Sequence, residues 1–148
     1  MSFNELRKGR VSQVGGIYHI TLVTQNRAPL FGDLQTGRKL VRQLMRLQQE
    51  GLAETLCFVL MPDHLHWLMA LHEGTLPKTV KLLKGRAAHD IGQPIWQTNY
   101  HDHAIRQDED LRRVARYIVA NPLRAGLVEQ IGDYSLWDAV WLNETLSG

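Results

Sequence analysis

The sequence lacks the features that mark a secreted or membrane-spanning protein. Cys57 is its only cysteine, so no disulfide can form within the chain and a cysteine-based zinc cage is excluded. No apolar run approaches the roughly 20 residues that a transmembrane helix needs, because Pro62 and Asp63 interrupt the longest candidate, Leu56 to Leu71. The N-terminal residues 1–16 contain no apolar core of the signal-peptide kind. We therefore expect a cytoplasmic protein that does not associate with membranes.

A strong charge of one sign is also missing. The chain has 17 Lys and Arg residues against 15 Asp and Glu residues, a formal net charge of +2, so charge alone is weak evidence for a nucleic-acid partner. Hydrophobic residues make up 44% and charged residues 22% of the 148 positions, as in ordinary globular proteins. We predict one domain over residues 1–148, with a basic leader at 1–16 and a tail at 130–148.

Hydrophobic periodicity predicts alternating strands and helices in the order βαββαβα. The expected extended segments cover residues 17–24, 53–61, 64–71, 95–97 and 100–106. The expected helices cover residues 33–50, 75 or 76 to 91, and 109–120, the last ending at Asn121-Pro122. This order is typical of the split βαβ, ferredoxin-like arrangement with an added C-terminal helix. We therefore expect an α+β fold with an antiparallel sheet whose first and third strands are central.

His64 and His66 begin the third predicted strand. Because strand side chains alternate between faces, both imidazoles point the same way, and two imidazoles roughly 7 Å apart along a strand can bind one metal ion. Such a pair leaves most coordination positions open, which suits a catalytic ion better than a closed structural site. The alternative is a pair of half-buried strand histidines without a ligand.

Arg113, Tyr117 and Asn121 follow one another at intervals of four residues on the last predicted helix. This spacing places them together on a face beside the apolar stripe. Tyr117 and Asn121 can therefore approach the same point, where the amide oxygen of Asn121 could complete a His-His-oxygen metal site. The alternatives are a packing role for Tyr117, and a helix-capping role for Asn121 before a proline.

Three strings, LMPDHLHWLM, HDHAIR and RRVARYIVANPLRAGLV, together resemble the REP-associated tyrosine transposases. These are single-tyrosine members of the HUH nuclease superfamily, and the resemblance spans residues 18–141. It implies a ferredoxin-like catalytic domain. By position in the motifs, His64 and His66 match the metal ligands, Tyr117 matches the nucleophile, and Asn121 matches the third metal ligand.

The resemblance implies metal-dependent cleavage and joining of single-stranded DNA at hairpins formed by repetitive extragenic palindromes (REPs). Tyr117 would attack the scissile phosphorus and form a 5′-phosphotyrosine link. A free phenol has a pKa of about 10, so a divalent ion is expected to assist by polarising the phosphate. We expect Mg²⁺ or Mn²⁺, because phosphate and amide oxygens suit hard cations. Members of this group act as monomers or homodimers, and either state is expected here.

Several other residues are candidates on weaker signals. In His101-Asp102-His103, Asp102 and His103 could orient a metal ligand, whereas His19 on the first strand is interpreted as a packing residue. The predicted DNA contacts are basic residues of the leader and of the last helix: Arg7, Lys8, Arg10, Arg113 and Arg116. Further candidates are the basic residues of the first two helices and three tryptophans able to stack on bases: Arg38, Arg42, Arg46, Lys78, Lys81, Lys84, Arg86, Trp96, Trp137 and Trp141.

The sequence leaves two other functions open. A non-catalytic ferredoxin-like module that binds hairpin DNA or RNA would bind without cleaving, and a chelator would not affect its binding. A metal-dependent hydrolase acting through water would stay active after Tyr117→Phe and lose activity after His64→Ala. The presence of Tyr117, His64, His66 and Asn121 together favours the tyrosine enzyme.

Overall fold

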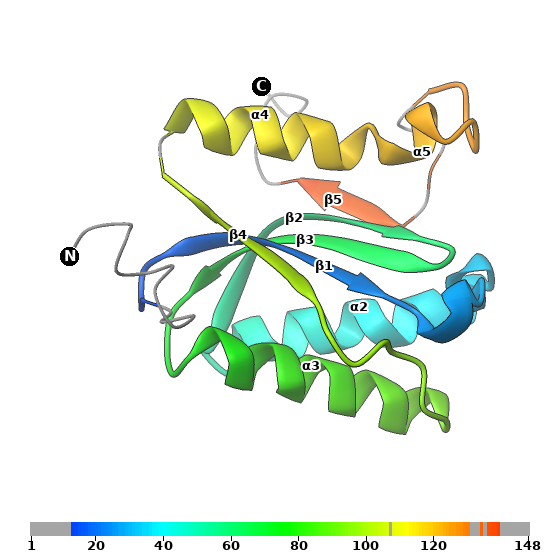
Figure 1. Ribbon diagram of the computed structural model, residues 1–148, viewed down its shortest axis with the longest axis horizontal. Helices are drawn as coiled ribbons and strands as arrows, with labels where there is room; N and C mark the ends of the chain where they lie inside the picture. The colour runs from blue at the N-terminus through cyan, green and yellow to red at the C-terminus, as the bar shows by residue number, and fades with distance from the viewer. Residues whose placement is uncertain (1–12, 107, 131–133, 135, 140–148) are drawn as a thin grey trace.

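An antiparallel sheet of five strands forms the centre of the protein (Figure 1). The computed structural model describes residues 13–106, 108–130, 134 and 136–139. The strands are β1 (Ile17–Val23), β2 (Ala53–Met61), β3 (His64–Leu71), β4 (His101–Ile105) and β5 (Trp137–Ala139). They lie in the order β4-β1-β3-β2-β5. The first four have the ferredoxin-like arrangement with β1 and β3 in the middle, which confirms the predicted fold class.

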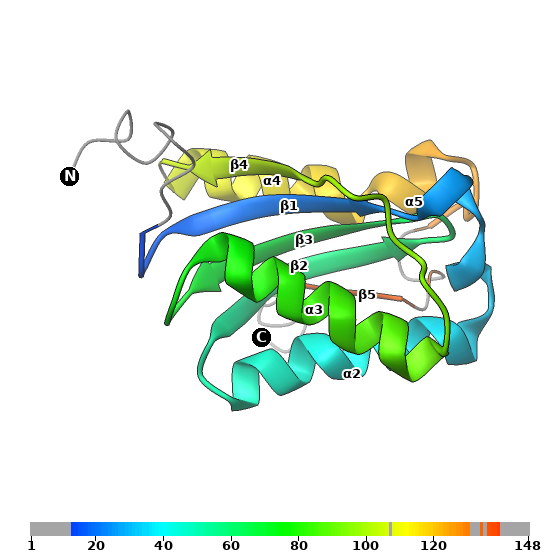
Figure 2. The same ribbon diagram turned by 60° about the horizontal axis from the view of Figure 1, so that its bottom comes forward.

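Helices α2 (Leu34–Gln49) and α3 (Leu76–Ile91) cover one face of this sheet (Figures 1 and 2). The carboxylate of Asp33 caps α2 by accepting from the backbone N–H of Thr36 at 3.2 Å, and Thr75 caps α3 in the same way. Helix α3 ends at Gly92, whose φ of 91° lies in the left-handed region that favours glycine. Both helices therefore begin and end close to the predicted residues, because local capping signals fix them.

Successive side chains of β1 point to opposite faces of the sheet, and each face of the sheet carries its own hydrophobic core. Tyr18, Ile20 and Leu22 face α2 and α3 and are at most 3% exposed. One face of each helix is buried against them, through the side chains of Leu40, Leu44, Leu47, Leu76, Val80, Leu83 and Ala87. Full burial of an aliphatic side chain of this size contributes about 1.5–3 kcal/mol. This core holds the central strands, and the side chains on their opposite face, in fixed positions.

Helix α4 (Asp108–Val119) covers the opposite face of the sheet and is followed by the short helix α5 (Asn121–Arg124). Ala115, Ile118 and Val119 of α4 are buried in a second core. Its sheet members are Cys57, Val59, Met61, Leu68 and Ile105. Val59 pairs with His66 and Met61 pairs with His64, and directly paired residues share a face of a sheet. The two histidines therefore lie on the face that α4 covers.

The helical course continues further than the sequence predicts. Ala120 keeps right-handed helical angles, and α5 begins directly at Asn121 with Pro122 in its first turn. A proline is tolerated there because the first N–H groups of a helix have no partner within the helix. The N–H of Ala125 donates to the carbonyl of Asn121 at 2.9 Å. Pro122 therefore starts a new turn instead of ending the helical segment.

Other departures from the expected elements are small. Strand β5, which pairs with β2, was not predicted, and residues 95–97 contribute only an isolated bridge between Trp96 and Thr24. The loop after β1 contains the 3-10 turns η2 (Gln25–Arg27) and η3 (Leu30–Gly32). No helix in the described part of the chain is both long and apolar enough to cross a membrane.

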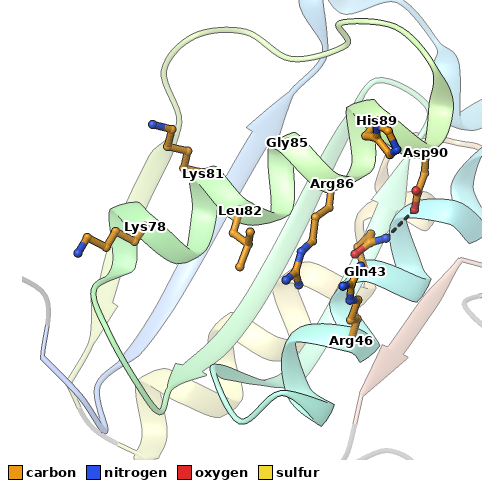
Figure 3. Close-up of a pocket in the computed structure, with 9 residues that line it drawn as sticks. All are labelled: Gln43, Arg46, Lys78, Lys81, Leu82, Gly85, Arg86, His89 and Asp90. Atoms are coloured by element: carbon orange, nitrogen blue, oxygen red, sulfur yellow. Dashed lines mark hydrogen bonds between the residues drawn. The ribbon is translucent and has the colours of Figure 1, made fainter.

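Helices α2 and α3 border a groove of about 450 Å³ (Figure 3). The side-chain amide of Gln43 donates to Asp90 at 2.5 Å across the two helices. Arg86 and Arg46 both contact the carboxylate of Glu50, at 2.5 and 3.5 Å. The basic residues predicted on these helices thus lie on the face of the sheet away from α4, and two of them are partly neutralised by an acidic neighbour.

Candidate active site

His64 and His66 stand side by side at the start of β3. Their ring centroids are 4.9 Å apart and the rings are nearly perpendicular, at 85°. Strand β3 is hydrogen-bonded to β1 on one side and to β2 on the other, so the backbone that carries the pair is held from both sides. The predicted convergence of the two imidazoles on one face is present in the structure.

Asp63, in the turn between β2 and β3, fixes the orientation of His64. Its Oδ1 lies 2.7 Å from Nδ1 of His64, and its Oδ2 accepts from Arg27 at 3.1 Å. Partial burial disfavours the carboxylate, but the hydrogen bonds from His64 and Arg27 outweigh it and lower the pKa of Asp63. With Nδ1 of His64 engaged, Nε2 is the nitrogen left for a metal ion.

Tyr117 approaches the histidine pair from α4. Its ring centroid lies 6.3 Å from that of His66, with the rings edge to face at 85°. Ile118 and Val119 are buried against the sheet, which anchors this part of the helix. The Tyr117 side chain itself is 52% exposed. A phenol beside the His66 imidazole and open to solvent can be reached by a substrate as large as a nucleic-acid strand.

Asn121 begins α5, four residues after Tyr117. Its Nδ2 donates to the carbonyl of Tyr117 at 3.3 Å and to that of Ile118 at 3.1 Å. These bonds hold the amide nitrogen against the end of α4, so the amide oxygen points away from those carbonyls. That oxygen is the part of Asn121 that can bind a cation, and the same side chain also caps the helix, as the alternative interpretation supposed.

Arg124 is a site residue that the sequence argument missed. Its guanidinium carbon lies 3.9 Å from the centroid of the Tyr117 ring, and Nη2 donates to the Tyr117 carbonyl at 2.7 Å. The spacing of Tyr117, Asn121 and Arg124, four and then three residues, is a helical signal for one shared face. We predicted a helix end at Pro122, and this hid the signal.

His19, interpreted from sequence as a packing residue, contacts His66 directly. Nε2 of His19 lies 3.0 Å from Nδ1 of His66, and the Thr21 hydroxyl lies 3.4 Å from the same nitrogen. Burial, then the nearby charges of His64, His19 and Arg124, lower the pKa of His66 to about 3. Burial and the charge of His103 lower the pKa of His19 to about 4. Both rings are therefore neutral near pH 7, the form in which an imidazole binds a metal.

The residues predicted to orient a ligand separate onto two faces. His103 pairs with His19 between β4 and β1, and therefore shares the face of the site, one strand further from His66. Asp102 pairs with Ile20, whose side chain belongs to the core under α2 and α3. A residue on that face does not reach the histidine pair. The side chains that contact His64 and His66 through a ring nitrogen include those of Asp63 and His19, whereas Asp102 and His103 were the residues predicted to orient a ligand.

The predicted DNA contacts are distributed unevenly. Arg113 and Arg116 are exposed on α4; Arg113 forms an ion pair with Asp110, and its side chain is 76% exposed. The leader residues Arg7, Lys8 and Arg10, Trp141 and the side chain of Trp137 lie outside the described residues. Trp96 is partly buried and packs on Phe31, with 5.6 Å between ring centroids.

The donor set fits an open divalent site. Among the described residues, no three His, Cys, Asp or Glu side chains gather as a potential metal site. A donor of another residue type would complete the histidine pair. The Asn121 amide oxygen is such a donor. Two imidazole nitrogens and one neutral oxygen leave room for phosphate oxygens and water, which suits a catalytic ion.

Comparison with known proteins identifies the family. The family model described as "Transposase IS200 like" matches residues 12–121. The chain belongs to this family. It is 29% identical over 124 residues to the REP-associated tyrosine transposase of Escherichia coli strain K12, covering 81% of this chain and 74% of that protein. A Haemophilus influenzae protein matches at 29% identity over 139 residues, covering 81% of this chain and 77% of that protein.

A solved structure of a REP-associated tyrosine transposase bound to a REP hairpin is also similar to this IS200-like transposase. The two superimpose with a TM-score of 0.76 at 27% identity, over 85% of this chain and 78% of that chain. The residues that the family model matches, 12–121, contain strands β1 to β4, α4 and the start of α5. The family assignment therefore covers the elements that carry His64, His66, Tyr117 and Asn121.

Proposed function

We propose that this transposase cleaves and rejoins single-stranded DNA at REP hairpins, with Tyr117 as the nucleophile. The observation that carries the proposal is the edge-to-face contact of the Tyr117 ring with His66, at 6.3 Å between centroids. Family membership supports a DNA-transfer reaction. The REP hairpin named for the similar solved structure supports the class of substrate.

In the proposed step, Oη of Tyr117 attacks the scissile phosphorus, and its proton passes to solvent, to which the side chain is 52% exposed. The bond from phosphorus to the 3′-oxygen breaks, and that oxygen leaves with the electron pair and takes up a proton. The products are a 5′-phosphotyrosine and a free 3′-hydroxyl. The covalent link retains the energy of the phosphodiester, so a 3′-hydroxyl of another strand can reverse the step and join the ends.

His64, His66 and Asn121 would hold the divalent cation, Mg²⁺ or Mn²⁺, through the two Nε2 atoms and the amide oxygen. When bound, such an ion polarises the phosphate and neutralises charge on the leaving oxygen. The chain's own contacts prepare this arrangement. Asp63 holds His64 by Nδ1, and the end of α4 holds the amide nitrogen of Asn121.

Arg124 would orient the nucleophile. The guanidinium lies against the Tyr117 ring and is bonded to the backbone of the same residue, which restricts the rotation of the ring. Its positive charge lies over the Tyr117 ring, and a guanidinium matches the geometry of the phosphate that Tyr117 would attack. Arg113 and Arg116, together with Arg7, Lys8 and Arg10, are proposed to contact the DNA backbone further from the reacting phosphorus.

We further propose that one chain is sufficient for cleavage. His66 and Tyr117 come from the same chain, so a monomer contains both parts of the proposed centre. This favours the monomer over a dimer that exchanges the tyrosine helix between subunits.

The test is formation of a covalent protein–DNA adduct. A hairpin oligonucleotide with single-stranded flanks is incubated with wild-type protein in Mn²⁺ or Mg²⁺, and the adduct is resolved by denaturing gel electrophoresis. Wild-type protein is expected to form it, whereas Tyr117→Phe and His64→Ala are not. Tyr100→Phe is the matched control, because Tyr100 packs against the core on the α2 and α3 face of the sheet.

Each alternative function predicts a different result. Cleavage by Tyr117→Phe would indicate a hydrolase that uses water. A non-catalytic binding module would give another result: the wild type would bind the hairpin in the presence of chelator and would form neither an adduct nor a cleaved product. Either result would overturn the proposal.

A further inference from the structure

The contact between His19 and His66 joins two neighbouring strands on the face of the site. Strand β1 pairs with β3, and the ring centroids of the two histidines are 5.2 Å apart. Nε2 of His19 and Nδ1 of His66 are 3.0 Å apart. This is a hydrogen-bond distance, so one of the two nitrogens carries the proton and the other accepts it.

The geometry restricts how His66 can bind a cation. Its Nδ1 faces His19 and Thr21, so only Nε2 is directed away from these partners. A neutral imidazole that binds through Nε2 carries its proton on Nδ1. Nδ1–H of His66 then donates to Nε2 of His19, which must be the acceptor. A metal-binding histidine is typically held by such a partner on its other nitrogen.

We propose that His19 is a positioning residue that fixes the tautomer and ring orientation of His66, so that Nε2 of His66 faces the cation. His19 has for His66 the role that Asp63 has for His64, with a neutral acceptor in place of a carboxylate. The inference rests on the proposed function, because it assumes that His66 is a metal ligand. It assigns to His19 a role in metal binding that a packing residue would not have.

The experiment measures Mn²⁺ binding to the metal-free protein by isothermal titration calorimetry, without DNA. His19→Leu keeps a side chain of similar size and removes the acceptor. His19→Gln keeps an acceptor oxygen near the position of Nε2. His66→Ala reports on the metal site itself. His72→Gln is the control, since His72 is exposed just beyond the end of β3 and its Nε2 lies 3.4 Å from a carboxylate oxygen of Glu54.

We expect His19→Leu to weaken Mn²⁺ binding by about 10- to 100-fold, the usual effect of losing such a partner. His19→Gln should retain most of the affinity, and His72→Gln should match the wild type. If His66→Ala weakens binding and His19→Leu does not, the role of His19 is refuted and the metal site stands. If His66→Ala binds Mn²⁺ as tightly as the wild type, the proposed metal site itself fails.

A second measurement covers the case in which His19→Leu does not fold. Two-bond ¹H–¹⁵N correlation spectra of the wild-type protein with Mg²⁺ identify the protonated nitrogen of each histidine. We expect His66 in the Nδ1–H form and His19 with an unprotonated Nε2. A proton on Nε2 of His66 would overturn the inference whatever the variant does.

Discussion

Replacing Arg124 is the most direct probe of how the nucleophile is held. Two interactions are lost in Arg124→Gln: the contact of the guanidinium with the Tyr117 ring, at 3.9 Å from its centroid, and the 2.7 Å hydrogen bond to the Tyr117 carbonyl. A cation–π contact at an exposed site contributes about 0.5–1 kcal/mol. A hydrogen bond of this type adds about 0.5–1.5 kcal/mol. The free energy of unfolding should therefore fall by about 1–2.5 kcal/mol.

Two readouts separate the structural from the catalytic part of this effect. In a domain of this size, a loss of about 1–2.5 kcal/mol lowers Tm by about 3–8 °C. The rate of adduct formation, measured in a single turnover at saturating hairpin DNA, should fall by about 10- to 100-fold, because a small misplacement of a reacting group has effects of that order. Arg124→Lys keeps the charge without the planar group, and should give an intermediate rate.

Arg112→Gln is the matched control for this experiment. Arg112 is also exposed on α4, but it stands five residues before Tyr117 and so faces another side of the helix. It should leave Tm and rate close to the wild-type values. A wild-type rate of adduct formation in Arg124→Gln would refute the proposed role of Arg124 in orienting Tyr117.

The fold supplies further predictions. The Tyr134 hydroxyl donates to the Leu60 carbonyl at 2.5 Å, so Tyr134→Phe should lower the free energy of unfolding by about 1 kcal/mol in denaturant titrations at pH 7. Burial raises the pKa of Tyr134 in the folded protein. The stabilisation by this hydroxyl is therefore complete below the pKa of the unfolded phenol, about 10, and is lost as the pH rises through the pKa of the folded protein. The difference between wild type and Tyr134→Phe should therefore shrink at alkaline pH, and a constant difference would contradict this assignment. Gly85→Ala in α3 meets open space and should raise the free energy of unfolding by about 0.5–1 kcal/mol, whereas Gly37→Ala in α2 would place Cβ 2.6 Å from Leu136 and should not stabilise. Equal melting temperatures for the two glycine variants would show that Leu136 moves away from the new Cβ at position 37 without loss of stability.

Much of the scaffold follows from local sequence signals. Asp33, Thr75 and Gly92 mark helix ends through hydrogen bonds and dihedral angles that involve only their near neighbours. The two-residue turn at Pro62-Asp63 requires β2 and β3 to be antiparallel neighbours. Where a local signal is compatible with two outcomes, the prediction was wrong, as at Pro122, which can follow a helix end or occupy the first turn of a new one.

The candidate site also has some features that follow from local sequence and others that depend on tertiary packing. Strand alternation alone places His64 and His66 on one face, and helical spacing alone places Tyr117 near Asn121, because both periodicities are properties of the backbone. The meeting of Tyr117 with His66, and of His19 with His66, depends on which face α4 covers and which strand lies beside β3. These contacts join residues 51 and 47 positions apart in the chain. Only the packing of α4 on the sheet and the pairing of β1 with β3 bring them together, and neither is encoded within a local segment of sequence.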